Sequence, residues 1–159
     1  MTLKNITKLT EADLHYLAGF LDGDGSIMAQ IVKGNSYKYG YSIRVTICFY
    51  QKTKRHWFLL KLRKLLGKDW KIRKRNDGMS ELYITGFTPV KNILISLQPY
   101  FRLNPRLAKL VLEIIDEYSQ IQNEADFLEV CKKIDKTAEY TDSKKRKNTY
   151  SSVKTYLNS

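Results

Sequence analysis

The chain has 159 residues, and 28 lysines and arginines against 16 aspartates and glutamates give it a formal net charge of +12. This length predicts one domain, residues 1–159, and an apolar content of 43% argues against a disordered chain. The two cysteines, Cys48 and Cys131, are too far apart in sequence for a CxxC motif or a disulfide scaffold. The positive charge predicts an anionic partner, with nucleic acid as the first candidate.

A membrane partner is not expected from this sequence. The first ten residues lack the apolar stretch of a signal peptide. No apolar run approaches the roughly 20 residues that a membrane-spanning helix needs.

The first predicted element is a helix that begins near Glu11, because Thr10 and Asp13 have the spacing of a capping box. Apolar residues at positions 14, 17, 18 and 21 follow at helical spacing, and the helix ends at residues 22–25, where two glycines occur. Residues 27–33 and 42–50 alternate between apolar and polar side chains. They predict two strands that pair as a hairpin.

The second half of the predicted core repeats this order. A leucine-rich helix covers residues 55–66 and ends at Gly67, and a basic strand at 70–75 turns at residues 76–78 into a return strand at 81–85. Thr88 and Pro89 predict the N-cap and first residue of a helix that reaches position 97. Helices at 106–118, at 124–138 and from position 151 follow. The order α-β-β-α-β-β-α with appended helices predicts an α+β domain whose sheet is covered on one face.

Asp22-Gly23-Asp24-Gly25 places two carboxylates two residues apart at the end of the first helix. Such residues also make a plain helix stop, because Asp and Gly are frequent in turns. An EF-hand calcium loop is excluded, since Ile27 and Lys33 stand where that loop requires Gly and Glu. A magnesium site for phosphodiester hydrolysis is the third interpretation, and it needs a second copy of the motif to complete it. The tetrapeptide alone leaves the helix stop and the magnesium site open.

Residues 17–25, LAGFLDGDG, resemble the signature of the LAGLIDADG homing endonucleases, with matches at Leu17, Ala18, Gly19, Asp22, Asp24 and Gly25. A single copy of the motif is typical of the homodimeric branch. Further segments, in the same order along the chain, resemble the single-motif enzymes encoded in green-algal chloroplast introns. These segments are residues 24–27, 51–53, 57–59, 97–99, 127–131 and 142–144.

The resemblance implies an antiparallel, saddle-shaped sheet and a catalytic carboxylate at Asp24. Asp24 and the backbone carbonyl of Gly23 would hold Mg²⁺, with Mn²⁺ expected to substitute and Ca²⁺ expected to bind without supporting cleavage. Asp22 is expected to cap or brace the end of the helix. Gln51 and Arg55 match catalytic positions that organise water molecules in this family.

One position departs from the family pattern. Family members often carry a lysine that reaches the active site from the position of Asn104. Asn104 cannot supply a positive charge, so Arg106 or Arg102 is the candidate for the missing cation. The departure weakens the prediction of cleavage more than the prediction of DNA binding.

The motif helices of two protomers are expected to pack side by side, because small residues let two backbones approach closely. The residues predicted at this seam are Leu17, Ala18, Gly19 and Asp22, with Gly23 beside them. Double-stranded DNA is the expected partner, and each sheet would read half of a long pseudo-palindromic site. The predicted base contacts are Met28, Gln30, Ser36, Tyr37, Ser42, Arg44, Thr46, Cys48, Arg73, Arg75 and Glu81, and the predicted phosphate contacts are Lys144, Lys145 and Lys147.

The function implied is a site-specific DNA endonuclease that starts intron homing. An RNA-binding maturase that assists splicing of the host intron is an alternative, because LAGLIDADG folds occur in both roles. A cleavage-dead DNA-binding homologue is another alternative, and Asn104 is the residue that motivates it. The resemblance places the protein in an organelle, with the chloroplast favoured over the mitochondrion.

Overall fold

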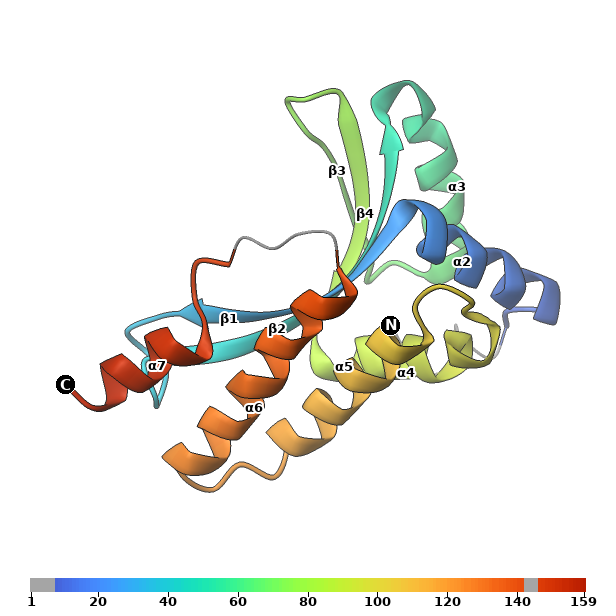
Figure 1. Ribbon diagram of the computed structural model, residues 1–159. Coiled ribbons are helices and arrows are strands. Elements are labelled where there is room, and N and C mark those ends of the chain that lie inside the picture. The colour runs from blue at the N-terminus through green and yellow to red at the C-terminus, as the bar shows by residue number, and fades with distance from the viewer. Residues whose placement is uncertain (1–7, 142–145) are drawn as a thin grey trace. The chain divides into compact units, whose positions relative to one another are not determined.

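Figure 1 shows the computed structural model of the chain, which describes residues 8–141 and 146–159. Its four strands form one sheet with the order β1-β2-β4-β3. The chain divides into two compact units, residues 1–27 with 46–105 and residues 28–45 with 106–159. The prediction of a single domain over residues 1–159 stays a prediction. None of the helices within the described ranges has the length and apolar character of a membrane span.

The first unit contains most of the predicted motifs. It holds the start of β1 (Gly25–Lys33), the second half of β2 (Tyr41–Lys52), and then α2 (Glu11–Asp24), η1 (Thr53–Arg55), α3 (His56–Leu66), β3 (Lys71–Lys74), β4 (Met79–Thr85), α4 (Phe87–Leu97) and η2 (Gln98–Tyr100). The helices α3 and α4 both contact β4, and α2 contacts α4. One face of the sheet is therefore covered in this unit, as the sequence predicts.

The strand register in the first unit decides which side chains share a face. β2 pairs with β4 antiparallel, with Thr46 opposite Thr85 and Gln51 opposite Ser80, and β3 pairs with β4 with Arg73 opposite Glu81. Side chains alternate along a strand. The covered face consequently carries buried apolar residues, Ile47, Phe49, Leu82 and Ile84, and the other face carries Thr46, Cys48, Tyr50, Glu81 and Tyr83.

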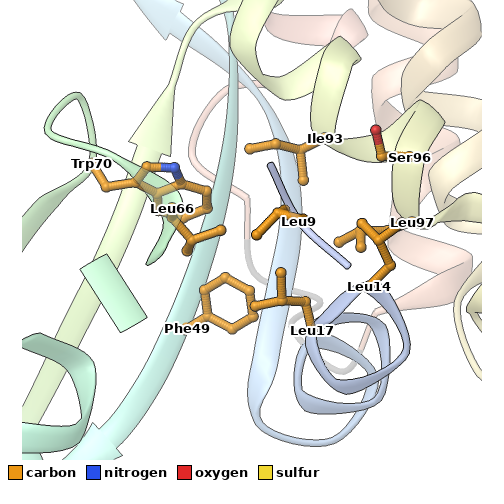
Figure 2. Close-up of a pocket in the computed structure, with 9 residues that line it drawn as sticks. All are labelled: Leu9, Leu14, Leu17, Phe49, Leu66, Trp70, Ile93, Ser96 and Leu97. Carbon is orange, nitrogen blue, oxygen red and sulfur yellow. The ribbon is translucent and has the colours of Figure 1, made fainter. Parts of the chain in front are cut away.

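The core of the first unit closes around Trp70, which has no exposed surface and whose ring centroid lies 5.7 Å from that of Phe49. Figure 2 shows a small apolar hollow beside these rings, with Leu17 of α2 next to Phe49. Ser96 is the single polar residue among the nine that line it. This hollow is part of the core, and its lining offers no chemistry for a phosphodiester.

The second unit holds the rest of β1 and β2 with α5 (Pro105–Tyr118), α6 (Glu124–Lys136), η3 (Thr137–Tyr140) and α7 (Tyr150–Leu157). The apolar face predicted for α5 is buried and consists of Leu107, Leu110, Val111, Ile114 and Ile115. Lys133 of α6 forms ion pairs with Glu113 and Glu117 of α5. These ion pairs join the two helices.

Two helix boundaries test the capping predictions. The capping box is confirmed, because Thr10 Oγ1 accepts from the Asp13 amide at 3.1 Å and Asp13 Oδ2 accepts from the Thr10 amide at 3.0 Å. The predicted N-cap at Thr88 is wrong. α4 begins at Phe87, and its N-cap is Gly86, whose φ of +127° lies in a region that other residues rarely adopt. Pro89 then sits inside the first turn, where its missing N–H costs no helical hydrogen bond.

Candidate active site

The junction between α2 and β1 fixes the position of Asp24. The helix ends at Asp24 and the strand begins at Gly25, with no residue between them. A Cβ atom on Gly25 would lie 2.5 Å from Leu21 Cδ1 and 2.9 Å from the Cys48 carbonyl oxygen. Only glycine allows this close approach of α2 to β2. Ser26 continues the contact, since its Oγ lies 3.1 Å from the Tyr50 hydroxyl.

Asp24 itself points to solvent. Across residues 8–141 and 146–159, no hydrogen bond or ion pair engages its carboxylate. No cluster of three or more His, Cys, Asp or Glu side chains in the described ranges could hold a metal ion. The Asp24 carboxylate is therefore an exposed oxygen donor, and with the Gly23 carbonyl it makes up the ligand set expected from the sequence. This donor set suits Mg²⁺, which often takes one or two carboxylates and completes its shell with water and substrate phosphate.

Asp22, two residues earlier, is fully engaged inside the chain. Its Oδ2 accepts hydrogen bonds from the backbone amides of Arg102 at 2.8 Å and Leu103 at 3.1 Å, and its Oδ1 accepts from the Asn104 amide at 3.1 Å. The carboxylate thus ties α2 to the segment that follows η2. The two acidic residues of the motif have different surroundings, and Asp24 is the one left free for a ligand.

The same three hydrogen bonds hold the segment that contains Asn104, the position at which family members often carry a lysine. Asn104 is half-buried and held by Asp22, and Arg102 is exposed two residues before it. Arg106, the other candidate cation, is exposed in the first turn of α5 and belongs to the second unit. Arg102 is therefore the candidate that is attached to the motif helix by a contact within the first unit.

Gln51 and Arg55, both predicted from the resemblance as catalytic positions, lie together in the structure. Gln51 is near the end of β2, Arg55 closes η1, and Arg55 Nε donates to Gln51 Oε1 at 2.5 Å. The bond leaves the two Nη groups of Arg55 and the amide nitrogen of Gln51 as further donors. Two groups with directed donors at one strand end can order water molecules beside a phosphate.

The uncovered sheet face carries a charged cluster. Glu81 accepts from Arg73 Nε at 2.6 Å and from Arg75 Nη1 at 3.2 Å, and Arg75 also pairs with Asp77 at 2.6 Å. The hydrogen bond with Glu81 raises the pKa of Arg73. Glu81 orients both guanidinium groups, which stay exposed and can present donors to DNA.

Cys48 lies beneath this cluster. Burial raises the pKa of its thiol to about 12, and burial also raises the pKa of Tyr50. The side chain of Cys48 is 2% exposed, and Thr46 is 7% exposed with its hydroxyl 3.1 Å from that of Thr85. The solvent exposure expected for Thr46, Cys48 and Glu81 is not found, because neighbouring side chains on the same face cover them.

The other predicted DNA contacts differ in exposure. Gln30, Ser36, Tyr37, Arg44, Arg73, Arg75 and Lys147 are exposed, and Met28 and Ser42 are half-buried. Lys144 and Lys145 lie outside the described residues. Tyr50 and Tyr83 are half-buried on the uncovered face and were not predicted, although the alternation of β2 extends to Tyr50. Arg73 lies over the Tyr83 ring, 5.7 Å from its centroid.

The predicted dimer seam needs a correction. Leu17 is 1% exposed and Ala18 has no exposed surface, because both pack into the core of their own chain and cannot meet a partner. The opposite side of α2 is open. A Cβ atom on Gly19 or Gly23 would meet nothing within 4 Å, and Tyr16 is 54% exposed.

An aromatic cluster continues this open side of α2. Tyr16 and Phe20 of α2 contact Phe58 of α3, with ring centroids 6.4 and 5.9 Å away, and Trp57 lies 6.0 Å from Phe58. Trp57 is 55% exposed. Aromatic rings such as these are common in protein interfaces, so this side of α2 offers contacts to a partner.

Comparison with known proteins agrees with the family that the motif at residues 17–25 resembles. A family model described as LAGLIDADG endonuclease matches residues 17–117. DNA endonuclease I-CreI of Chlamydomonas reinhardtii is 42% identical over 154 residues, which cover 96% of this chain and 93% of that protein. DNA endonuclease I-CvuI of Chlorella vulgaris is 43% identical over 131 residues, which cover 82% of this chain and 81% of that protein.

A solved structure matches nearly the whole fold. I-CvuI in complex with the I-CreI target, in the presence of magnesium and with the DNA not cleaved, aligns with a TM-score of 0.87 and 38% sequence identity. The alignment covers 93% of this chain and 94% of that chain. The expected α+β fold is therefore confirmed.

Proposed function

Because this chain belongs to the LAGLIDADG endonuclease family, we propose that it is a site-specific DNA endonuclease that acts as a homodimer and starts intron homing. One observation carries the proposal. The Asp24 carboxylate is exposed and has no protein partner among the described residues, and the close packing at Gly25 sets its place at the helix end. A carboxylate kept free at a fixed position is what a shared metal site requires.

The proposed cofactor is Mg²⁺, which Asp24 and the Gly23 carbonyl would hold, with Mn²⁺ as a substitute and Ca²⁺ as a non-supporting analogue. When bound, the cation would supply a Lewis acid that stabilises charge on the scissile phosphate and lowers the pKa of attacking water. Gln51 and Arg55 orient that water through their free donors. Arg102 is proposed to provide the positive charge that Asn104 does not.

The homodimer is proposed because one chain holds half of the ligands. The open side of α2, with Gly19 and Gly23, allows a second α2 to approach at backbone distance. Two Asp24 carboxylates would repel each other without a cation, so metal binding and close approach of the two protomers support one another.

The DNA contacts are proposed for the uncovered face of the sheet. Arg73 and Arg75 are held by Glu81 in a geometry that leaves donors for guanine, and the net charge of +12 attracts the phosphate backbone. In the second unit, the exposed candidates for DNA contact are Gln30, Arg44 and Lys147. By resemblance to green-algal relatives, the proposed location is an organelle, with the chloroplast favoured.

The test uses a randomised duplex library, incubated with the protein and Mg²⁺, Mn²⁺ or Ca²⁺, followed by sequencing of cut ends. Cutting at one long pseudo-palindromic sequence with Mg²⁺ or Mn²⁺ is the expected result. Asp24→Asn should lower the cleavage rate by at least about 1000-fold, because it removes the charge that holds the cation, and should leave duplex binding intact. Asp126→Asn is the matched control, since Asp126 only caps the start of α6.

Two outcomes separate the alternatives. Duplex binding without cutting under any metal identifies a cleavage-dead homologue, which the loss of lysine at position 104 favours. Preferred binding to structured intron RNA over duplex DNA identifies a maturase. Normal cutting by the Asp24→Asn protein would show that Asp24 does not hold the metal ion.

A further inference from the structure

A buried hydroxyl lies next to the Gln51–Arg55 pair. Ser80 of β4 has no exposed surface, although it is polar, and it stands directly opposite Gln51 in the β2–β4 ladder. Buried polar groups are stable only when hydrogen-bonded. The partners of Ser80 therefore show which part of the chain it holds.

Ser80 contacts both ends of the turn that carries Arg55. Its Oγ donates to Thr53 Oγ1 at 3.2 Å, at the start of η1, and lies 2.9 Å from His56 Nδ1, at the start of α3. A serine hydroxyl has one hydrogen, so donation to Thr53 makes His56 Nδ1–H the donor toward Ser80. The Thr53 amide also donates to the Gly78 carbonyl at 2.8 Å.

We propose that Ser80 and His56 are positioning residues, which hold the turn Thr53–Arg55 so that Arg55 keeps its hydrogen bond with Gln51. Arg55 is exposed and its long side chain has many rotamers, so the backbone of its turn must be fixed for the guanidinium to return to one place. The proposal rests on the proposed nuclease function, in which Gln51 and Arg55 order water at the scissile phosphate.

The test compares two variants at position 56 with the parent enzyme. His56→Phe keeps a ring but removes the donor, and His56→Asn keeps a donor nitrogen near the place of Nδ1. Under single-turnover conditions at saturating enzyme with Mg²⁺, we expect His56→Phe and Ser80→Ala to cut at least about 10-fold more slowly, because small misplacement of a positioning group is costly. His56→Asn should recover most of the rate. DNA affinity, measured with Ca²⁺, should change by less than about twofold, since neither residue faces the DNA.

Ser96→Ala is the matched control. It removes a half-buried serine hydroxyl that bonds the Asn92 carbonyl at 3.0 Å in the same unit, away from the turn. Thermal unfolding shows whether each variant is folded at the assay temperature. Equal loss of rate in Ser96→Ala, or an unchanged rate in both His56→Phe and Ser80→Ala, overturns the proposal.

A second readout does not depend on cleavage. The Arg55 Nε–H resonance reports its hydrogen bond with Gln51 in the apoprotein. In Ser80→Ala we expect this resonance to shift and broaden, and in Ser96→Ala to stay unchanged. If the parent protein cuts no DNA, the nuclease function fails while this resonance still decides the positioning role, and an unchanged resonance in Ser80→Ala refutes it.

Discussion

The two sides of α2 are built from neighbouring residues and have opposite surroundings. On one side, Leu17, Ala18 and Leu21 have at most 1% of their surface exposed and pack against the core that Figure 2 shows. On the other side, Gly19 and Gly23 face open space. The motif helix therefore has a side that stabilises its own chain and a side that is free for a second chain. The nine-residue motif combines residues that stabilise the fold with residues that are available to a second chain. Only the structure shows which residues have which role.

The largest expected effect is on the buried side. Leu17→Ala removes apolar contacts beside Phe49 and leaves a cavity, so the free energy of unfolding should fall by roughly 2–5 kcal/mol. Urea denaturation at fixed protein concentration measures this loss. Ile95→Ala, at a position 53% exposed, is the control and should cost well under about 1 kcal/mol. A small effect of Leu17→Ala would contradict the place of Leu17 in the core.

The next effect is on the open side. Gly19→Leu has room for its side chain within one protomer, so the chain should fold, but the added volume should block a second α2. We expect the dimer dissociation constant to rise at least about 100-fold, equivalent to about 2.7 kcal/mol. Sedimentation velocity over a dilution series measures it. Ala125→Leu, on the exposed surface of α6, is the control, and an unchanged dimer in Gly19→Leu would exclude this side of α2 from the interface.

A smaller effect is expected at Asp22, where the helix is tied to residues 102–104. Asp22→Ala leaves three backbone amides without their acceptor, at a cost of roughly 1–3 kcal/mol. Amide hydrogen exchange at Arg102, Leu103 and Asn104 should become faster. Asp13→Ala removes a carboxylate from the other end of the same helix and should leave exchange at these amides unchanged.

The smallest effect has the opposite sign. Gly19→Ala should raise the stability of the helix by roughly 0.5–1 kcal/mol, because alanine loses less backbone entropy in a helix than glycine. In the same variant the dimer should become weaker, since a methyl group now separates the two backbones. Denaturation over a range of protein concentrations separates the two contributions. A variant that gains stability without loss of association would show that close backbone approach at Gly19 is not needed.

Local signals in the sequence predicted the local structure well. The Thr10 capping box, the amphipathic face of α5 and the turn at residues 76–78 depend on residues a few positions apart, and all three are confirmed. The helical spacing of Leu14, Leu17, Ala18 and Leu21 predicted the helix itself, but it did not show that Leu17 and Ala18 are buried in the core of their own chain.

Contacts between distant residues could not be predicted. Asp22 bonds amides 80 to 82 positions later, and no local pattern encodes that distance. The burial of Cys48, which lies opposite Tyr83 of β4, depends on neighbours outside its own strand that alternation along β2 alone does not include. The partners of Ser80 likewise follow from strand register and could only be found in three dimensions.

The sheet order leaves β1 and β3 as its outer strands, and an outer strand with free carbonyls can recruit strands from other molecules. The segment before α7 covers the edge strand β1. Arg146 Nη1 donates to the Ala29 carbonyl at 3.3 Å, and Asn148 Nδ2 donates to the Ile31 carbonyl at 3.1 Å. At the other edge of the sheet, β3 is four residues long, and three of these residues are basic. Both edge strands are thus protected against pairing with other molecules. Side chains cover the carbonyls of β1, and β3 is short and charged, which helps the protein to stay dispersed while it searches a genome.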